Sequence, residues 1–142
     1  MSNNEMFKEY KKNQINNANQ PKLILMLYDG AIKFINKAIE LISKKNASNL
    51  EEIHKNIIRA QDIIAELTAS LNMDIGDISQ RLFSIYMYVN NKLIEANIKK
   101  DEKPLQECKK YLVDLRGAWE KASKSDQVQD NKMKDGRVNI AT

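Results

Sequence analysis

The chain has 142 residues and a formal net charge of +4, and 42% of its residues are hydrophobic but only 6% are aromatic. This length suits one domain, and four Gly with two Pro are too few for the turn-dense pattern of an all-β fold, so a mostly helical domain is expected. A single cysteine, Cys108, excludes an internal disulfide framework. No run approaches the ~20 apolar residues of a membrane span, and the first residues lack the apolar core of a signal peptide, so a cytoplasmic protein is expected.

Residues 1–18 are predicted to form a mostly polar arm or short helix that cannot build a core alone. Phe7 and Tyr10 lie three residues apart, so one helical turn would place both rings on the same side, and Ile15 adds a third apolar anchor. These side chains need a groove to lie in. The broad apolar face of the following helix is the candidate.

The first long helix is predicted to follow the N-cap Asn19 and to have an unusually broad apolar face. Two apolar series at three-four spacing run side by side along it, and one partner helix cannot cover both. One series is Leu27, Ala31, Phe34, Ala38 and Leu41, and the other is Leu25, Tyr28, Ile32, Ile35, Ile39 and Ile42. Gly30 costs the helix about 1 kcal/mol relative to alanine, and its missing side chain would let a neighbouring segment come close.

Three further helices are predicted from the same periodicity. The second begins at a capping box of Ser48 and Glu51, the third spans about 77–99, and the fourth opens at Pro104. Their seams are Leu50, Ile53, Ile57, Ala60, Ile64, Leu67 and Leu71; then Ile78, Leu82, Ile85, Val89, Leu93 and Ala96; then Leu105, Cys108, Leu112, Leu115, Trp119 and Ala122. The apolar face of the third helix is again wider than one seam requires, with Phe83, Tyr86 and Ile94 on an adjoining line.

These elements predict an all-α fold, an antiparallel up-down-up-down four-helix bundle over residues 19–122, because four helices of ~20 residues are joined by short turns. From Ser123 the apolar period stops. Residues 123–142 are therefore predicted to form a polar, disordered tail.

The residue combinations that catalysis needs are missing from this sequence. Glu51 and His54 have the Glu-x-x-His form of di-iron bundles, but such a site needs the motif twice and the chain has one histidine. Cys108 has no histidine near it in sequence, and the four glycines are isolated, so neither a Cys/His nucleophile nor a phosphate-binding loop is predicted. The protein is expected not to be an enzyme and to hold no metal or cofactor.

The surplus apolar width of the first and third helices leaves two interpretations open. One is an ordinary core with a few exposed side chains. The other is a groove that receives an amphipathic segment from another protein. A separate alternative is a helical regulatory adaptor that binds an anionic partner through surface lysines, although the basic residues are not interleaved with exposed aromatics as nucleic-acid binding would favour.

The sequence also resembles a known family over roughly residues 7–122. The shared pattern consists of Tyr10, Ile15, Ala18 and Asn19; Leu23-x-x-Met-Leu-Tyr-Asp-Gly30-Ala; Ala60-Gln-x-Ile-Ile64; Leu71-Asn-Met73; Leu93-x-x-Ala-Asn97 with Asp101; and Trp119. In this order they resemble the flagellin export chaperones of the FliS family. The family has Ser-Pro where this chain has Asn19-Gln20, with Pro21 one residue later, a change that preserves helix capping.

The resemblance implies a cytoplasmic export chaperone for flagellar type III secretion. Such a chaperone binds the C-terminal segment of flagellin in hydrophobic grooves and prevents its premature polymerisation, and the flagellar export gate is a further candidate partner. By position, the resemblance places the arm anchors and groove residues at Phe7, Tyr10, Ile15, Leu23, Leu27, Tyr28, Ile32, Phe83, Tyr86 and Met87. Neither a nucleic-acid partner nor membrane insertion is expected.

Overall fold

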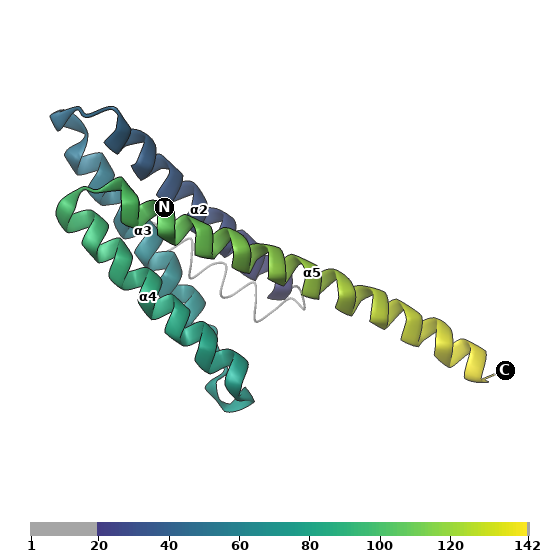
Figure 1. Ribbon diagram of the computed structural model, residues 1–142. Coiled ribbons are helices and arrows are strands. Elements are labelled where there is room, and N and C mark those ends of the chain that lie inside the picture. The colour runs from purple at the N-terminus through teal and green to yellow at the C-terminus, as the bar shows by residue number, and fades with distance from the viewer. Residues whose placement is uncertain (1–19, 142) are drawn as a thin grey trace.

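The computed structural model describes the backbone of residues 20–141, with side chains for residues 20–74 and 76–124 (Figure 1). The four α-helices of this range are α2 (Gln20–Ser43), α3 (Leu50–Ala69), α4 (Asp77–Lys99) and α5 (Glu102–Ala141). Short 3-10 turns, η1 (Ala47–Asn49) and η2 (Met73–Ile75), precede α3 and α4. The predicted arm of residues 1–18 and the predicted cap Asn19 lie outside the described residues.

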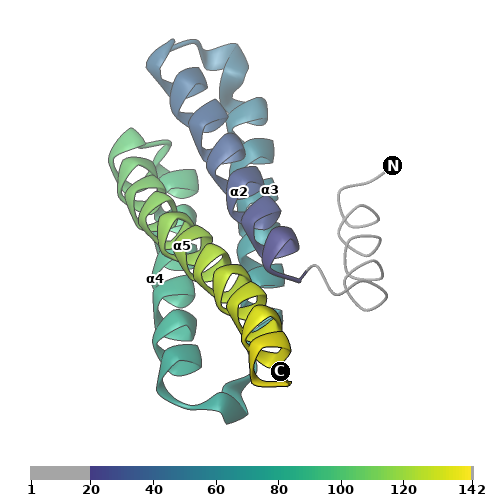
Figure 2. The same ribbon diagram turned by 90° about the vertical axis from the view of Figure 1, so that its right-hand side faces the viewer.

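The helices pack in chain order around one core, and α5 closes the ring against α2 (Figure 2). Each helix runs antiparallel to the one before it, because every connection is only a few residues long. The predicted all-α, up-down-up-down four-helix bundle is therefore confirmed.

Most of the core comes from the predicted helical seams. The prediction is wrong for Leu50 and Ile78, which lie at the starts of α3 and α4 and are 49% and 71% exposed. The largest fully buried aliphatic side chains of the core are Ile35, Ile57, Ile63, Ile64, Leu67, Leu93, Leu105 and Leu112. Tyr28 and Tyr86 are buried among them, with 0% and 1% of their surface exposed. Along each helix the buried residues are spaced three or four positions apart, which keeps their side chains on one face of a helix of 3.6 residues per turn.

The predicted capping box at Ser48 and Glu51 is wrong. Asn46 caps this region instead, because its side-chain oxygen accepts the backbone N–H of Ser48 at 3.0 Å and the Ser48 hydroxyl at 2.9 Å. The chain forms the η1 turn before α3 begins, so the Ser48 hydroxyl is already used and no side-chain cap forms at the helix start, Asn49. An asparagine two residues upstream gives a nearly identical sequence signal, since Asn and Ser are both strong caps.

Gly30 lies where α2 comes close to α3. A Cβ added there would lie 3.1 Å from Cδ1 of Ile63, whereas a Cβ added at Gly117 of α5 would meet nothing within 4 Å.

We expect Gly30→Ala to change the free energy of unfolding by less than about 0.5 kcal/mol, because a helix-propensity gain of about 1 kcal/mol is offset by the crowded contact. Gly117→Ala is the matched control and should stabilise by roughly 1 kcal/mol in urea unfolding. Equal gains at both positions would mean that Ile63 does not limit the packing.

The C-terminal part of α5 extends away from α2, α3 and α4 (Figure 1). Its backbone stays helical to Ala141, across the boundary predicted at Ser123. A helix without tertiary packing is only marginally stable in water. The division at Ser123 remains a prediction, and the packed part of α5 is the part that carries the apolar seam.

Candidate functional site

Four large apolar side chains of α4 lie in a line on its outer surface. They are Phe83, Met87, Ile94 and Ile98, here called the α4 stripe, and each exposes at least 40% of its surface, with 78% for Ile98. Their spacing of four, seven and four residues keeps them on one side of the helix. The stripe therefore covers most of the length of α4.

The stripe follows the seam between α4 and α3, where two polar pairs join the helices. Gln61 donates its side-chain N–H to the Asn90 oxygen at 3.0 Å, and the Asn97 amide lies 2.8 Å from Nδ1 of His54. In this antiparallel register, Ile58 of α3 lies level with Leu93 and Ile94 of α4. Ile58 is 38% exposed and extends the apolar surface onto α3.

We call the α4 stripe together with Ile58 the α3–α4 face. Single exposed hydrophobic residues are common on soluble proteins and need no explanation. These five residues instead lie along two adjacent helices on either side of a polar seam, and exposed apolar side chains gathered on one face are typical of binding surfaces. The regular spacing matches what an amphipathic helix needs from the surface on which it docks.

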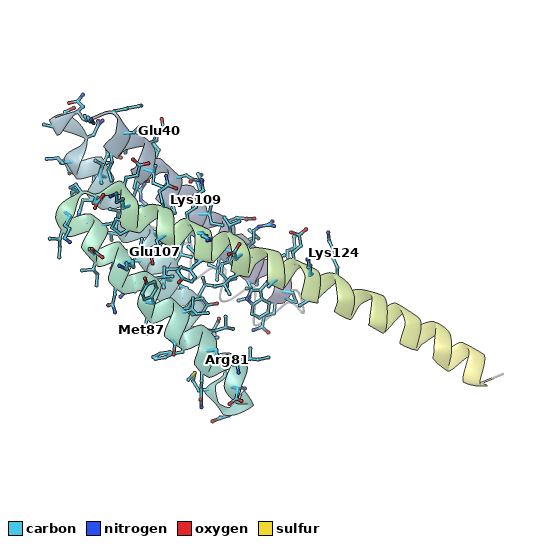
Figure 3. The ribbon with its side chains drawn as sticks, in the orientation of Figure 1. Glu40, Arg81, Met87, Glu107, Lys109 and Lys124 are labelled. Carbon is cyan, nitrogen blue, oxygen red and sulfur yellow. The ribbon has the colours of Figure 1, made fainter. Side chains whose placement is uncertain are left out.

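The structure divides the site residues predicted from the sequence into three groups. Phe83 and Met87 lie exposed on the α3–α4 face, and Figure 3 marks Met87 on α4. Leu23, Leu27 and Ile32 are half-buried on α2, and Tyr28 and Tyr86 are fully buried. Phe7, Tyr10 and Ile15 lie outside the described residues.

Tyr28 and Tyr86 join α2 to α4 through their hydroxyl groups, which are 2.5 Å apart. Nε1 of Trp119 on α5 donates to the Tyr28 hydroxyl at 3.1 Å, so three helices share one buried polar network. These tyrosines can support a binding surface from below, but their rings are not accessible to a ligand in this structure.

Three members of the α3–α4 face are absent from the sequence-predicted site, namely Ile58, Ile94 and Ile98. The sequence carries a signal for two of them, because Ile94 and Ile98 continue the line that starts at Phe83 and Met87. Periodicity shows that the third helix is too wide for one seam. It does not show which flank the neighbouring helices leave uncovered.

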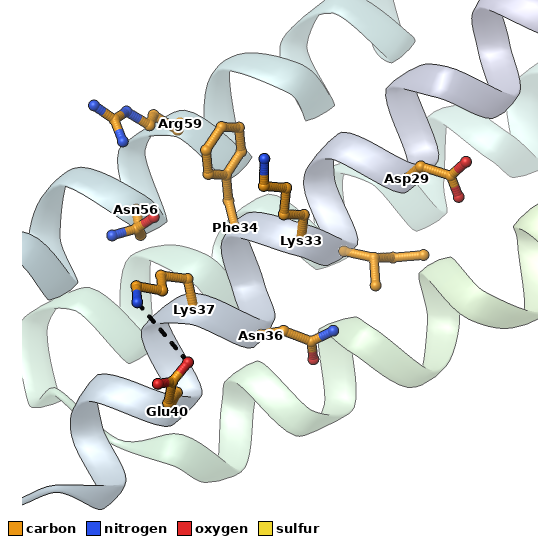
Figure 4. Close-up of a pocket in the computed structure, with 9 residues that line it drawn as sticks. Asp29, Lys33, Phe34, Asn36, Lys37, Glu40, Asn56 and Arg59 are labelled. Carbon is orange, nitrogen blue, oxygen red and sulfur yellow. Dashed lines mark ion pairs between the residues drawn. The ribbon is translucent and has the colours of Figure 1, made fainter.

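A surface depression of about 660 Å³ lies between α2 and α3. Figure 4 shows the residues that line it. Its charges are mixed, since Lys33, Lys37 and Arg59 line it together with Asp29 and Glu40. Lys37 lies 3.9 Å from Glu40, and the Arg59 guanidinium lies over the Phe34 ring at 5.7 Å. No nucleophile or pair of catalytic groups converges there, so a solvated polar surface is the better interpretation.

The Cys108 thiol is a core group and not a nucleophile in the folded state. It is 1% exposed, and it donates to the Val89 carbonyl at 3.5 Å. Burial, with a smaller contribution from the nearby Glu107 carboxylate, raises its pKa to about 12.

We expect Cys108 to react with a disulfide reagent at pH 8 at least about 100-fold more slowly in native protein than in urea, because the thiolate is the reactive form. Native labelling at the unfolded rate would contradict this burial.

Among the side chains that the structure describes, no three His, Cys, Asp or Glu residues gather closely enough to hold a metal ion. None of the described helices is both long and apolar enough to cross a membrane. The chemistry available at the α3–α4 face is thus apolar contact and hydrogen bonding.

This fold defines an all-α four-helix bundle with an exposed apolar face on α3 and α4. The model of the flagellar protein FliS family matches residues 2–126. The flagellar secretion chaperone FliS of Bacillus subtilis is 38% identical over 118 residues, 83% of this chain and 86% of that protein, and its Vibrio cholerae counterpart is 29% identical over 116 residues, 78% and 83% of the two chains. The chain belongs to the FliS family.

A solved structure confirms the fold independently. A crystal structure of a bacterial flagellar chaperone superposes with a TM-score of 0.69 at 22% identity, covering 87% of this chain and 99% of that one. Identity at this level supports the bundle architecture alone.

Proposed function

We propose that this protein is a cytoplasmic export chaperone that binds the C-terminal segment of flagellin on its α3–α4 face. Binding would prevent premature polymerisation and keep flagellin competent for flagellar type III secretion. The exposed α4 stripe is the observation that carries the proposal. The names of the relatives, which are flagellar secretion chaperones, support a flagellar protein as the client.

The physical reason for such a surface is the cost of ordering a flexible client. A segment that folds as it binds loses conformational entropy, so it must bury a large apolar area to bind stably. The α4 stripe offers such an area along most of α4, in two pairs of side chains separated by the exposed Asn91. The same contact hides the client's own apolar side chains, which would otherwise pair with other flagellin molecules.

The residues of the proposed site have two different roles. Phe83 and Met87 would contact the client, while Leu23, Leu27, Tyr28, Ile32 and Tyr86 would hold the helices beneath or beside it. For the arm we propose that Phe7, Tyr10 and Ile15 compete with the client for an apolar surface. The apparent affinity for the client would then equal the intrinsic affinity multiplied by the fraction of molecules in which the arm leaves that surface free.

Calorimetry with the last ~40 residues of the cognate flagellin tests the proposal, with a negative heat-capacity change as the marker of apolar burial. We expect a 1:1 complex and a gain of helicity in circular dichroism. Full-length flagellin should lose its binding when that segment is deleted. Undiminished binding of the truncated flagellin would refute the proposal.

The same titration at two salt concentrations distinguishes apolar docking from the adaptor alternative. Binding through lysines to an anionic partner weakens steeply with salt, whereas apolar docking changes little. Several lysines are already paired with acidic groups nearby in the chain, including Lys44 with Glu40 at 3.4 Å and Lys99 with Glu95 at 3.2 Å. We therefore expect the flagellin affinity to change less than about threefold between low and moderate salt.

A further inference from the structure

A pocket of about 330 Å³ lies at the end of the bundle, where Lys100 of the turn between α4 and α5 lines it together with residues of the α2–α3 connection and the adjoining helix ends. Apolar side chains form most of its wall, and two lysines lie among them. The main lining residues are Leu41, Ile42, Leu50, Ile53, Lys45 and Lys100. The pocket thus combines an apolar interior with two ammonium groups.

Lys100 is held in place by its own turn. It ends α4 in the left-handed backbone conformation, with φ of 50°. Its Nζ donates to the Asn97 carbonyl at 2.6 Å and to the Asn97 side-chain oxygen at 2.5 Å, which leaves one ammonium proton unused. Burial lowers the pKa of Lys100, and no carboxylate among the described residues forms an ion pair with it.

Lys45 supplies the second charge. It also has a left-handed backbone, with φ of 50°, and its N–H donates to the Ile42 carbonyl at 3.1 Å. No ion pair joins Lys45 to a carboxylate of the described residues. Two cations that form no ion pair with a carboxylate of the described residues, beside one apolar pocket, favour a ligand that is both apolar and anionic.

The pocket continues the α3–α4 face. Ile98, the last residue of the α4 stripe, precedes Lys100 by two positions, and Leu50 at the pocket is 49% exposed. Asn97 links the two regions, because its side chain pairs with His54 on the polar seam and accepts from Lys100. A peptide that follows the stripe toward Ile98 would therefore reach the pocket at its end.

We propose that this pocket binds the last residue of the flagellin segment, with its side chain against the apolar wall and its free α-carboxylate between Lys45 and Lys100. This inference rests on the proposed function and adds a direction to it, since the client would run along α4 with its C-terminus at the Lys100 end. An apolar residue at a chain end carries its side chain and a free carboxylate on one carbon atom, the combination that the pocket offers to bind. The pocket is at the lower limit of typical ligand sites, ~300 Å³, which suits a chain end and not a helix.

The experiment compares three peptides by calorimetry: the last ~40 residues of flagellin with a free C-terminus, the same peptide as an amide, and the same peptide extended by Gly-Ser. We expect the free acid to bind about tenfold tighter than either of the other two, as a charge-assisted contact implies. The extended peptide keeps a carboxylate but moves it beyond the native end. It therefore separates recognition of the chain end from general attraction to negative charge.

The lysines are tested with the Lys45→Met and Lys100→Met double variant. The acid-to-amide ratio should fall from about ten to about one, while Lys99→Met, an exposed neighbour paired with Glu95, should keep the wild-type ratio. Lys45→Met alone should reduce the ratio even if Lys100→Met disturbs its turn. Equal affinity of the acid and the amide for wild type, or an unchanged ratio in the double variant, would overturn the inference and leave the proposed function standing. Failure of all three peptides to bind wild type would overturn both.

Discussion

Met87→Glu should weaken binding of the flagellin C-terminal segment by about 100-fold while leaving the free energy of unfolding within about 0.5 kcal/mol of wild type. Met87 is 41% exposed and centrally placed on the α4 stripe, so a glutamate there stays hydrated in the free protein. In the complex the same carboxylate would be buried against an apolar helix without a partner. That cost is several kcal/mol, and about 2.7 kcal/mol already gives a 100-fold loss. Calorimetric titration and urea unfolding measure the two quantities.

Met26→Glu is the matched control because it makes the same substitution at the same exposure. Met26 is 42% exposed but lies on α2, away from the α3–α4 face. We expect its affinity for the flagellin segment to remain within about twofold of wild type, as surface substitutions away from the contact usually do. If both variants lose affinity equally, or if Met87→Glu binds normally, the α3–α4 face is not the binding surface.

The fold could be predicted from the sequence because burial repeats with the helical period. Ile57, Leu67 and Leu93 belong to seams in which every third or fourth residue is apolar, and all three are buried. The short connections then leave an antiparallel bundle as the natural arrangement. The start of α3 was predicted less well, because Asn46 and Ser48 are chemically similar caps and only the η1 turn decides between them.

The candidate site was less predictable because it depends on how far each helix is rotated about its axis. Phe83 and Tyr86 both belong to the wide apolar part of α4, yet the first is 40% exposed and the second is 1% exposed. Their spacing does not determine which one faces α2. The Tyr28 and Tyr86 hydroxyls are 58 residues apart in the chain, so their pairing follows only from the packed bundle. The pocket beside Lys45 and Lys100 was likewise not predictable, because its lining residues come from two turns that are far apart in the sequence.

The buried tyrosine pair also has a consequence at alkaline pH. Burial raises the pKa of Tyr86 well above its ordinary value of 10.0, with a further contribution from Tyr28, and burial likewise raises the pKa of Tyr28. Below pH 10 both tyrosines are protonated in the folded and the unfolded chain, so their contribution to stability is complete. Above pH 10 the unfolded chain loses these protons first, and stability falls as the pH rises toward the folded-state values.

Tyr28→Phe should destabilise the bundle by about 1–3 kcal/mol and Tyr86→Phe by about 1 kcal/mol, because the two hydroxyls have unequal numbers of partners. Both hydrogen bonds of the network, the one with the Tyr86 hydroxyl and the one from Nε1 of Trp119, use the Tyr28 oxygen, so its removal breaks both, whereas only a smaller interaction joins Trp119 to Tyr86. Removal of the Tyr86 hydroxyl leaves Tyr28 still accepting from Trp119. Urea unfolding at pH 7 measures the difference, and the double variant should cost little more than Tyr28→Phe alone, since the removed groups share one network. The opposite outcome is that both single variants lose the same free energy of unfolding and the double variant loses the sum. This would show that the hydroxyls act independently, and that the network does not hold α2, α4 and α5 together.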